Sequence, residues 1–237
     1  MRAKEFIIES TELITINKRL NPLLWDQGVL NPKIRDKLTA IADAFIENVG
    51  VELNVVDLTV TGSNANYTWT RHSDLDLHII VAGEITDSAR ELFTAKKSLW
   101  GEQHKITIKG LPVECYIQAE QEPHHSTGVY SILRDAWVVE PKKIKPRISD
   151  QAVAAKLESL VHDVQAALEQ DNLTTITRVK DKITSMRHAG LERAGEWSTE
   201  NLVFKQLRNM GLIDDLADRA RELQDQELSL EQAQPLD

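Results

Sequence analysis

Two aspartates separated by one residue, Asp74 and Asp76, are the residues of this chain best suited to chemistry. Side chains alternate along a strand, so the run "DLDLHIIV" places both carboxylates on one face, about 7 Å apart. Two carboxylates this close repel each other unless a cation lies near them, and hard cations such as Mg²⁺ prefer carboxylate oxygens. The pair therefore predicts a metal site at Asp74 and Asp76.

A Gly-Ser pair, Gly62 and Ser63, comes before these aspartates, and ten residues separate Ser63 from Asp74. The pair ends a strand-like run and begins a short helix that we predict in "NANYTWT". Glycine lets the backbone approach a ligand closely, N–H groups at a helix start attract anions, and a serine hydroxyl donates to phosphate oxygens. The pair thus predicts a phosphate site, and the neighbouring Arg71 and Ser73 are further candidates for nucleotide contacts.

A third acid, Glu114, alternates with apolar residues in "PVECYIQ". It can therefore project from a second strand toward the two aspartates. Three carboxylates on two strands are what two-metal phosphoryl transfer requires. Glu120 has the same strand parity and is the rival for this role, although its surroundings are less typical of a strand.

The elements that must position these residues mix helical and strand-like periods over the first 150 residues. Apolar steps of three and four predict a helix over 31–49 that Gly50 ends, and a second helix covers 87–100. Alternation predicts strands in "VVDLTVTG", with Val56, Leu58 and Val60 on one face, and in "DLDLHIIV", "HKITIK" and "PVECYIQ". We interpret "RLNPLLWDQGVLNP" as a loop anchored by Trp25, and "EPHHSTGVYS" as a loop leading into a short helix.

Beyond "EPKKIKPRISD", a basic segment with two prolines that we interpret as a linker, every pattern is helical. Predicted helices cover 153–168 and 173–189, the second ended by Gly190. Ser198 and Gly211 mark the N-cap and the C-terminal glycine of a third, and 214–228 forms the last. The chain is therefore expected to have an α/β (α+β) fold with a short mixed sheet, followed by a C-terminal helical domain. Its predicted parts are an N-terminal extension (1–30), a catalytic domain (31–147), a helical domain (148–230) and a tail (231–237).

The helical domain carries Lys180 and Arg187, seven residues apart and thus on nearly the same helix face. We consider them candidates for contacts with a bound triphosphate, and a solvated basic stripe is the alternative. In the loop before residue 131, Ser126, Thr127 and Tyr130 are either ribose or base contacts or members of a capped loop.

The segment "TGSNANYTWTRHSDLDLHI" resembles the signature of the DNA polymerase β-type nucleotidyltransferase superfamily. In that family a Gly-Gly or Gly-Ser pair is followed, after a gap like the one here, by an Asp-x-Asp strand and later by a third acid. The resemblance extends over 57–118. The flanking segments "LNPLLWD" and "GEWSTENLVFKQLRN" resemble those of uncharacterised, phage-like predicted nucleotidyltransferases. One departure is that the third acid is usually Asp, whereas Glu114 is longer by one methylene.

The resemblance implies a nucleotidyltransferase fold and a two-metal mechanism. Asp74, Asp76 and Glu114 would hold two Mg²⁺ or Mn²⁺ ions, and a hydroxyl acceptor would attack the α-phosphate of an NTP such as ATP, releasing pyrophosphate. The alternative is a catalytically inactive nucleotide-sensing or protein-interaction module on the same fold. A third interpretation is a helical adaptor in which Asp-x-Asp is accidental.

The charge and composition of the chain limit its expected cellular location and its expected binding partners. The net charge is −9 and the pI about 5.3, which argues against a broad nucleic-acid platform because phosphate neutralisation needs clustered Lys and Arg. A small-molecule or protein acceptor is therefore favoured over an RNA 3′ end, which stays open. One cysteine, no signal-like start and no long apolar run lead us to expect a cytoplasmic protein without a membrane span. The oligomeric state stays open.

Overall fold

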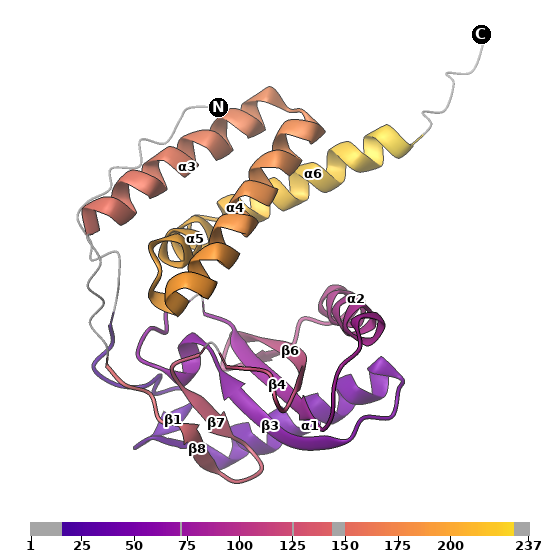
Figure 1. The fold of residues 1–237 in the computed structure, drawn as a ribbon, viewed down its shortest axis with the longest axis vertical. Coiled ribbons are helices and arrows are strands. Elements are labelled where there is room, and N and C mark those ends of the chain that lie inside the picture. The colour runs from indigo at the N-terminus through magenta and orange to yellow at the C-terminus, as the bar shows by residue number, and fades with distance from the viewer. Residues whose placement is uncertain (1–15, 72, 125, 144–149, 230–237) are drawn as a thin grey trace. The chain divides into compact units, whose positions relative to one another are not determined.

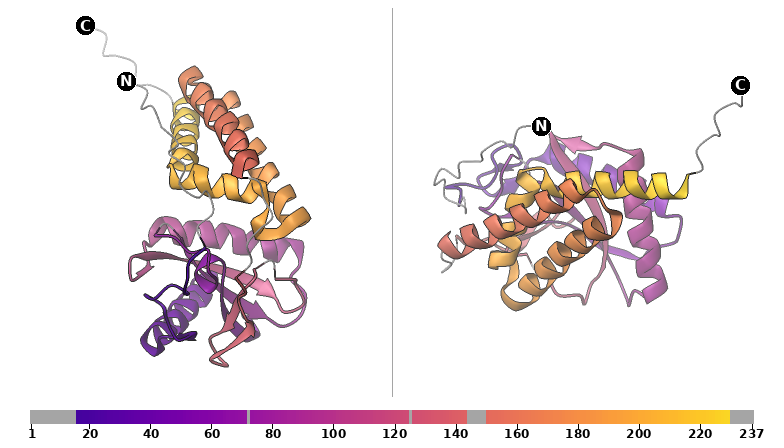
Figure 2. Two further views of the ribbon diagram at one scale, coloured as in Figure 1. Left: turned by 90° about the vertical axis from the view of Figure 1, so that its left-hand side faces the viewer. Right: turned by 90° about the horizontal axis from the view of Figure 1, so that it is seen from above.

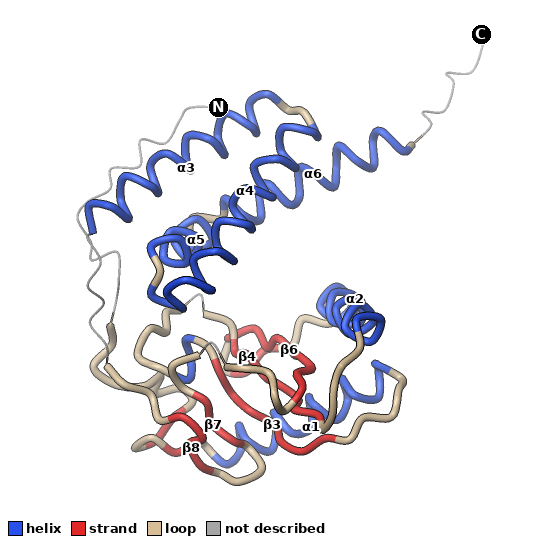
Figure 3. The backbone as a smooth tube through the Cα atoms, in the orientation of Figure 1, coloured by secondary structure: helices blue, strands red, loops and turns tan. Residues whose placement is uncertain are grey.

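The computed structural model describes residues 16–71, 73–124, 126–143 and 150–229 (Figure 1). These residues form two compact units, 16–143 and 150–229, divided within the predicted linker. All strands belong to the first unit, and the second contains only helices (Figure 3). The predicted tail, 231–237, lies outside the described residues. Among the residues described, no helix combines the length and apolar character that crossing a membrane requires.

The first unit is built on a six-stranded sheet with the order β5-β6-β4-β3-β7-β8. Its strands are β3 (Val55–Thr61), β4 (Leu75–Val81), β5 (Thr107–Ile108), β6 (Leu111–Ala119), β7 (Val129–Ser131) and β8 (Ala136–Val139). Strands β4 and β6 are parallel and every other neighbouring pair is antiparallel. The prediction of a mixed sheet in an α/β domain is therefore confirmed.

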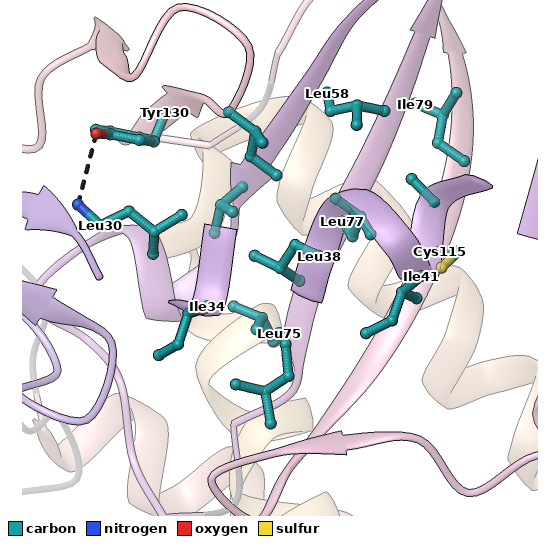
Figure 4. Packing of buried hydrophobic residues seen from close by; sticks show 14 of the residues in the cluster. Leu30, Ile34, Leu38, Ile41, Leu58, Leu75, Leu77, Ile79, Cys115 and Tyr130 are labelled. Atoms are coloured by element: carbon teal, nitrogen blue, oxygen red, sulfur yellow. Dashed lines mark hydrogen bonds between the residues drawn. The ribbon is translucent and has the colours of Figure 1, made fainter. Parts of the chain in front are cut away.

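Helix α1 (Pro32–Val49) covers the apolar face of the sheet. It begins where the Asn31 side chain accepts a hydrogen bond from Lys33 N–H and ends at Gly50, which has a left-handed backbone. Its buried side chains, including Leu38, pack against Leu77 and its neighbours on the sheet (Figure 4). Each fully buried leucine contributes about 1.5–3 kcal/mol relative to an exposed one, so this layer holds β4 in place.

Helix α2 (Asp87–Gln103) is capped by Thr86, whose side chain accepts from Ala89 N–H. Trp100 of α2 packs edge-on against Phe45 of α1, with ring centroids 5.7 Å apart. The helix also contacts β6. Its predicted start is confirmed, and its end lies three residues beyond the predicted one.

The N-terminal segment was expected to be an extension, but its described part belongs to the core. It forms a hairpin of β1 (Trp25–Asp26) and β2 (Val29–Leu30), where the sequence predicts a loop. Trp25 stacks on Trp137 of β8 at 4.7 Å and is almost completely buried. The two prolines in this segment concealed strands of only two residues each.

Two further predictions about the sheet are wrong. The segment before residue 131 leads into strand β7 rather than a short helix, because β7 pairs with β3 and β8. Val56 was expected on the apolar face, yet it is 40% exposed. A register shift between Val55 and Asp57 turns it outward, and such a bulge cannot be read from simple alternation.

The second unit consists of α3 (Asp150–Gln170), α4 (Leu173–Ala194), α5 (Thr199–Asn209) and α6 (Leu212–Leu228), which pack on one another (Figure 2). The predicted caps of α5 are confirmed: the Ser198 side chain accepts from Asn201 N–H, and Gly211 follows the helix with a left-handed backbone. The prediction that Gly190 ends α4 is wrong, because the helix continues to Ala194.

Gly190 is required by close packing rather than by a helix end. A Cβ atom at this position would lie 2.6 Å from Glu200 Cβ and 2.8 Å from Ser198 Oγ. We expect Gly190→Ala to destabilise the protein by about 1–3 kcal/mol, even though alanine favours helices by about 1 kcal/mol. The matched control is Gly101→Ala in α2, where nothing lies within 4 Å. In urea unfolding, the free energy of unfolding should rise for Gly101→Ala. A rise for Gly190→Ala would contradict the packing explanation.

Glu200 joins three helices of this unit through its carboxylate. Lys156 Nζ and Arg193 Nη2 each donate to it at 2.7 Å. Burial by itself would raise the pKa of Glu200, but the hydrogen bonds from Lys156 and Arg193 lower the pKa to about 2.

This lowered pKa predicts a pH-dependent contribution to stability. The contribution is complete above the ordinary Glu value, near 4.5, and is lost as the pH falls toward 2, because the unfolded chain takes up the proton first. We expect Glu200→Gln to lower the free energy of unfolding by about 1–3 kcal/mol at pH 7, and by clearly less at pH 3. Urea titrations of both proteins at the two pH values measure this, and an equal difference at both would contradict it.

Candidate active site

The aspartates and Glu114 lie on the face of the sheet opposite α1. Strand β4 lies between β3 and β6, and Asp76 aligns with Thr61 on one side and with Glu114 on the other. Aligned residues of neighbouring strands point to the same face, with strands about 4.8 Å apart. Asp74 directly precedes β4 and is two residues from Asp76, so it lies on the same face. The three predicted acids therefore share one end of one sheet face.

The rival third acid lies elsewhere. Glu120 follows the end of β6 and is exposed. It is six residues from Glu114, which corresponds to about 20 Å along a strand. The parallel pairing of β4 with β6 thus brings Glu114, and not Glu120, beside Asp76.

Gly62 lies directly against the Asp76 carboxylate. A Cβ atom on Gly62 would be only 1.9 Å from Asp76 Oδ2, and the Gly62 backbone has φ 72° and ψ −159°, a region open only to glycine. The Gly62 N–H donates to Ser126 Oγ at 3.1 Å. The glycine therefore serves a close approach between the loop after β3 and the aspartate on β4.

The residues after Gly62 form a single 3₁₀ turn, Ser63–Ala65, in place of the predicted short helix over "NANYTWT". Its bonds run from Ala65 N–H to Gly62 O and from Asn66 N–H to Ser63 O. These bonds do not use the N–H groups of Ser63 and Asn64 that start the turn, the groups suited to an anion. Ser63 itself is partly exposed.

Asn64 is a residue that the sequence did not single out. It is completely buried, and its side-chain Nδ2 donates to the carbonyl of Asp74 at 2.8 Å. Its Oδ1 accepts from Asn21, and its own carbonyl accepts from Trp25 Nε1. Asn64 thus joins the Gly-Ser turn to the start of β4. The only sign of this role in the sequence is an amide side chain two residues after Gly62. Nothing in the sequence identifies its partners, which are Asn21, Trp25 and Asp74.

Glu114 is hydrogen-bonded by Lys97 and by Tyr116. Lys97 Nζ of α2 lies 2.8 Å from Glu114 Oε2, and the Tyr116 hydroxyl donates to the same oxygen at 2.6 Å. Lys97 also lies over the Tyr116 ring, 3.5 Å from its centroid. Sequence reasoning missed Lys97, because a lysine on the predicted helix 87–100 gives no sign of which strand residue it meets.

A histidine shares this face. His78 stacks on Tyr116 with ring centroids 4.8 Å apart, and its Nδ1–H donates to Gln118 Oε1 at 2.8 Å. Burial lowers the pKa of His78 to about 4, so its imidazole is neutral at neutral pH. His78 therefore adds no positive charge beside the acids.

The other candidates have mixed positions. Ser73 is buried, and its hydroxyl accepts from Thr70 N–H at 2.9 Å, while Arg71 is exposed in the same loop. Lys180 and Arg187 belong to α4 in the second unit, where the Arg187 guanidinium lies 4.1 Å from the Phe204 ring centroid. Their proposed contact with a nucleotide stays a prediction.

The loop at 126–128 has a structural role in the first unit. Ser126 Oγ accepts from Gly62 and donates to the carbonyl of Gly128 at 2.8 Å. Thr127 Oγ1 accepts from Asn66, and Tyr130 is buried with its hydroxyl on Asp135. These contacts fit the capped-loop interpretation. Those of Ser126 and Thr127 also tie the loop to Gly62 and Asn66, on either side of the 3₁₀ turn.

The residues present suit a magnesium ion in one respect. Mg²⁺ is commonly bound through one or two carboxylates together with substrate phosphates and water, and Asp74 with Asp76 supplies such a pair. Within the described ranges, no three His, Cys, Asp or Glu side chains are gathered as a set that could hold a metal ion. The close fit of Gly62 on Asp76 fixes where one carboxylate oxygen must lie.

Comparison with known proteins does not assign this chain to a family. No family model matches the sequence, and no curated protein matches it. Among solved structures, the STING-associated CdnE c-di-GMP synthase from Capnocytophaga granulosa is 13% identical with a TM-score of 0.24, over 82% of this chain and 69% of that one. The spectinomycin adenyltransferase AAD(9) from Enterococcus faecialis, with ATP and spectinomycin, is 16% identical with a TM-score of 0.25, over 81% of this chain and all of that one. TM-scores this low do not establish a shared fold.

Proposed function

We propose that this protein is a metal-dependent nucleotidyltransferase that moves an NMP from an NTP to a hydroxyl acceptor and releases pyrophosphate. The single observation that carries the proposal is the contact between Gly62 and the Asp76 carboxylate, beside Asp74 and in register with Glu114. The turn that would bind phosphate thus contacts one of the two carboxylates that would bind the metal.

Asp74 and Asp76 would hold Mg²⁺ or Mn²⁺, and Glu114 would complete a site for two ions. When bound, such ions neutralise the triphosphate and stabilise the charge on the attacking and leaving oxygens. The Ser63 and Asn64 N–H groups would bind phosphate oxygens beside Gly62. Arg71 and Ser73, and Lys180 and Arg187 of the second unit, would add nucleotide contacts.

The reaction would be a single displacement. The acceptor hydroxyl oxygen forms a bond to the α-phosphorus, and the bond from that phosphorus to the oxygen bridging the α- and β-phosphates breaks. The bridging oxygen keeps the electron pair and leaves with pyrophosphate. The proton of the acceptor hydroxyl passes to one of the carboxylates of Asp74, Asp76 and Glu114. Most of the rate enhancement would come from positioning and charge neutralisation. A small molecule or a protein is the favoured acceptor, and an RNA 3′ end is the alternative.

A second candidate, an inactive nucleotide-sensing or protein-interaction module, is favoured by one observation. The third acid is paired with Lys97, which neutralises a carboxylate that an enzyme would use. Such a module would bind NTP equally well with and without Mg²⁺. Calorimetry of ATP binding in Mg²⁺ and in EDTA separates the two, because the enzyme requires the ion for tight binding.

The activity itself is tested by incubating the protein with each NTP, Mg²⁺ and a cell extract and measuring released pyrophosphate. We expect release that stops on addition of EDTA. An Asp74→Ala/Asp76→Ala double variant that released pyrophosphate at the wild-type rate would refute the proposal.

A further inference from the structure

Lys97 of α2 forms an ion pair with Glu114, the third of the predicted acids. Its ammonium lies 2.8 Å from Glu114 Oε2, and the side chains of Lys97 and Glu114 are 32% and 38% exposed. The pair is therefore neither fully solvated nor buried, and the two charges interact more strongly than an exposed pair would.

The position of Lys97 is fixed by the helix that carries it. Trp100, three residues later, packs edge-on against Phe45 of α1. The Tyr116 ring below the ammonium adds a cation–π contact at 3.5 Å. The packing of α2 and the contact with the Tyr116 ring thus both keep the Lys97 ammonium close to Glu114.

A divalent ion at Glu114 would meet this ammonium. Glu114 Oε2 already accepts from Lys97 and from the Tyr116 hydroxyl. An ion bound there would either displace the ammonium or lie within a few ångströms of it, and like charges at such distances repel strongly in a partly desolvated site. The negative charge of a triphosphate would remove most of this repulsion.

We infer that Lys97 competes with the metal for Glu114 in the nucleotide-free protein, so that metal and triphosphate enter the site together. The inference deepens the proposed function and depends on it. Lys97 pairs with the third acid while the site is empty of phosphate, and it is then available to pair with the phosphate when the nucleotide arrives. The metal affinity and the nucleotide affinity are thereby coupled through one ammonium group.

The test measures Mn²⁺ binding to the full-length protein without nucleotide, by electron paramagnetic resonance of free Mn²⁺. Lys97→Met keeps most of the apolar stem and removes the charge. We expect it to bind Mn²⁺ roughly ten-fold more tightly than the wild type, as removal of a like charge a few ångströms away implies. Lys97→Arg keeps the charge and should bind Mn²⁺ as the wild type does.

Lys96→Met is the matched control, because it removes the same charge from the adjacent residue of α2, whose ammonium bonds to a backbone carbonyl. Its Mn²⁺ affinity should stay near that of the wild type. Equal affinities of wild type and Lys97→Met, in a protein whose Mn²⁺ binding is lost in Asp76→Asn, would overturn the role of Lys97 and leave the proposed function standing. Absence of Mn²⁺ binding in all variants, even at millimolar Mn²⁺, would overturn both. Thermal unfolding of each variant shows that the fold is intact.

Discussion

Asp76→Asn is expected to lower the rate of pyrophosphate release by a factor of about 1,000 or more, because it removes a metal-binding charge at the reacting phosphate. The substitution keeps the shape of the side chain that lies against Gly62. Steady-state release of pyrophosphate from NTP in Mg²⁺ measures the loss, and a thermal melt shows that the fold of the variant is intact.

Glu120→Gln is the matched control for this loss. It removes one carboxylate near the end of the strand that carries Glu114, at a position far from Asp76 along the sheet. Its rate should equal that of the wild type, whereas Glu114→Gln should be strongly impaired. An Asp76→Asn protein with wild-type activity would contradict the assigned role of Asp76, and a loss in Glu120→Gln equal to that in Glu114→Gln would contradict the choice of Glu114.

Gly62→Ala is expected to reduce activity by at least about 100-fold and to lower the free energy of unfolding by about 2–4 kcal/mol. The added methyl group would overlap Asp76 Oδ2, at 1.9 Å, in a backbone region that only glycine favours. Relief requires movement of the loop, of the aspartate, or of both. Because catalysis depends on their mutual position, the rate should fall more than the stability predicts.

Gly83→Ala separates backbone strain from the contact with Asp76. Gly83 also has a positive φ, of 82°, but nothing lies within 4 Å of the position a Cβ would take. We expect the free energy of unfolding of this variant to fall by about 1 kcal/mol and its activity to be unchanged. If Gly62→Ala behaved in the same way as Gly83→Ala, in urea unfolding and in the transfer assay, the contact would have no catalytic importance.

Local patterns were sufficient for much of the fold. Alternation in "DLDLHIIV" predicted that Leu75, Leu77 and Ile79 face the core, and all three are completely buried. Ser198 predicted the start of α5 and Gly50 predicted the end of α1, for physical reasons that hold within a few residues. Where pairing changed the local pattern, the predictions failed, as at the bulge beside Val56 and in the short strands β1, β2, β7 and β8.

The candidate site was less accessible to sequence reasoning, because its contacts join distant segments. The alternation around Glu114 was visible, but its register with Asp76 depends on the parallel pairing of β4 with β6. Lys97 and Asn64 were missed because neither belongs to a periodic pattern that points to its partner. Gly190 was misinterpreted as a helix end, since close packing and helix termination call for the same residue.

Transfer of label from an NTP to an acceptor tests the central claim most directly. The protein is incubated with Mg²⁺, a cell extract and ATP labelled at either the α- or the γ-phosphate, and the assay is repeated with the other three NTPs. The proposed mechanism predicts that one NTP transfers its α-label to a discrete acceptor, that its γ-label is found in pyrophosphate, and that both are lost in Asp74→Ala/Asp76→Ala. Label transferred from the γ-position, or transfer of the α-label that persists in the double variant, would contradict it.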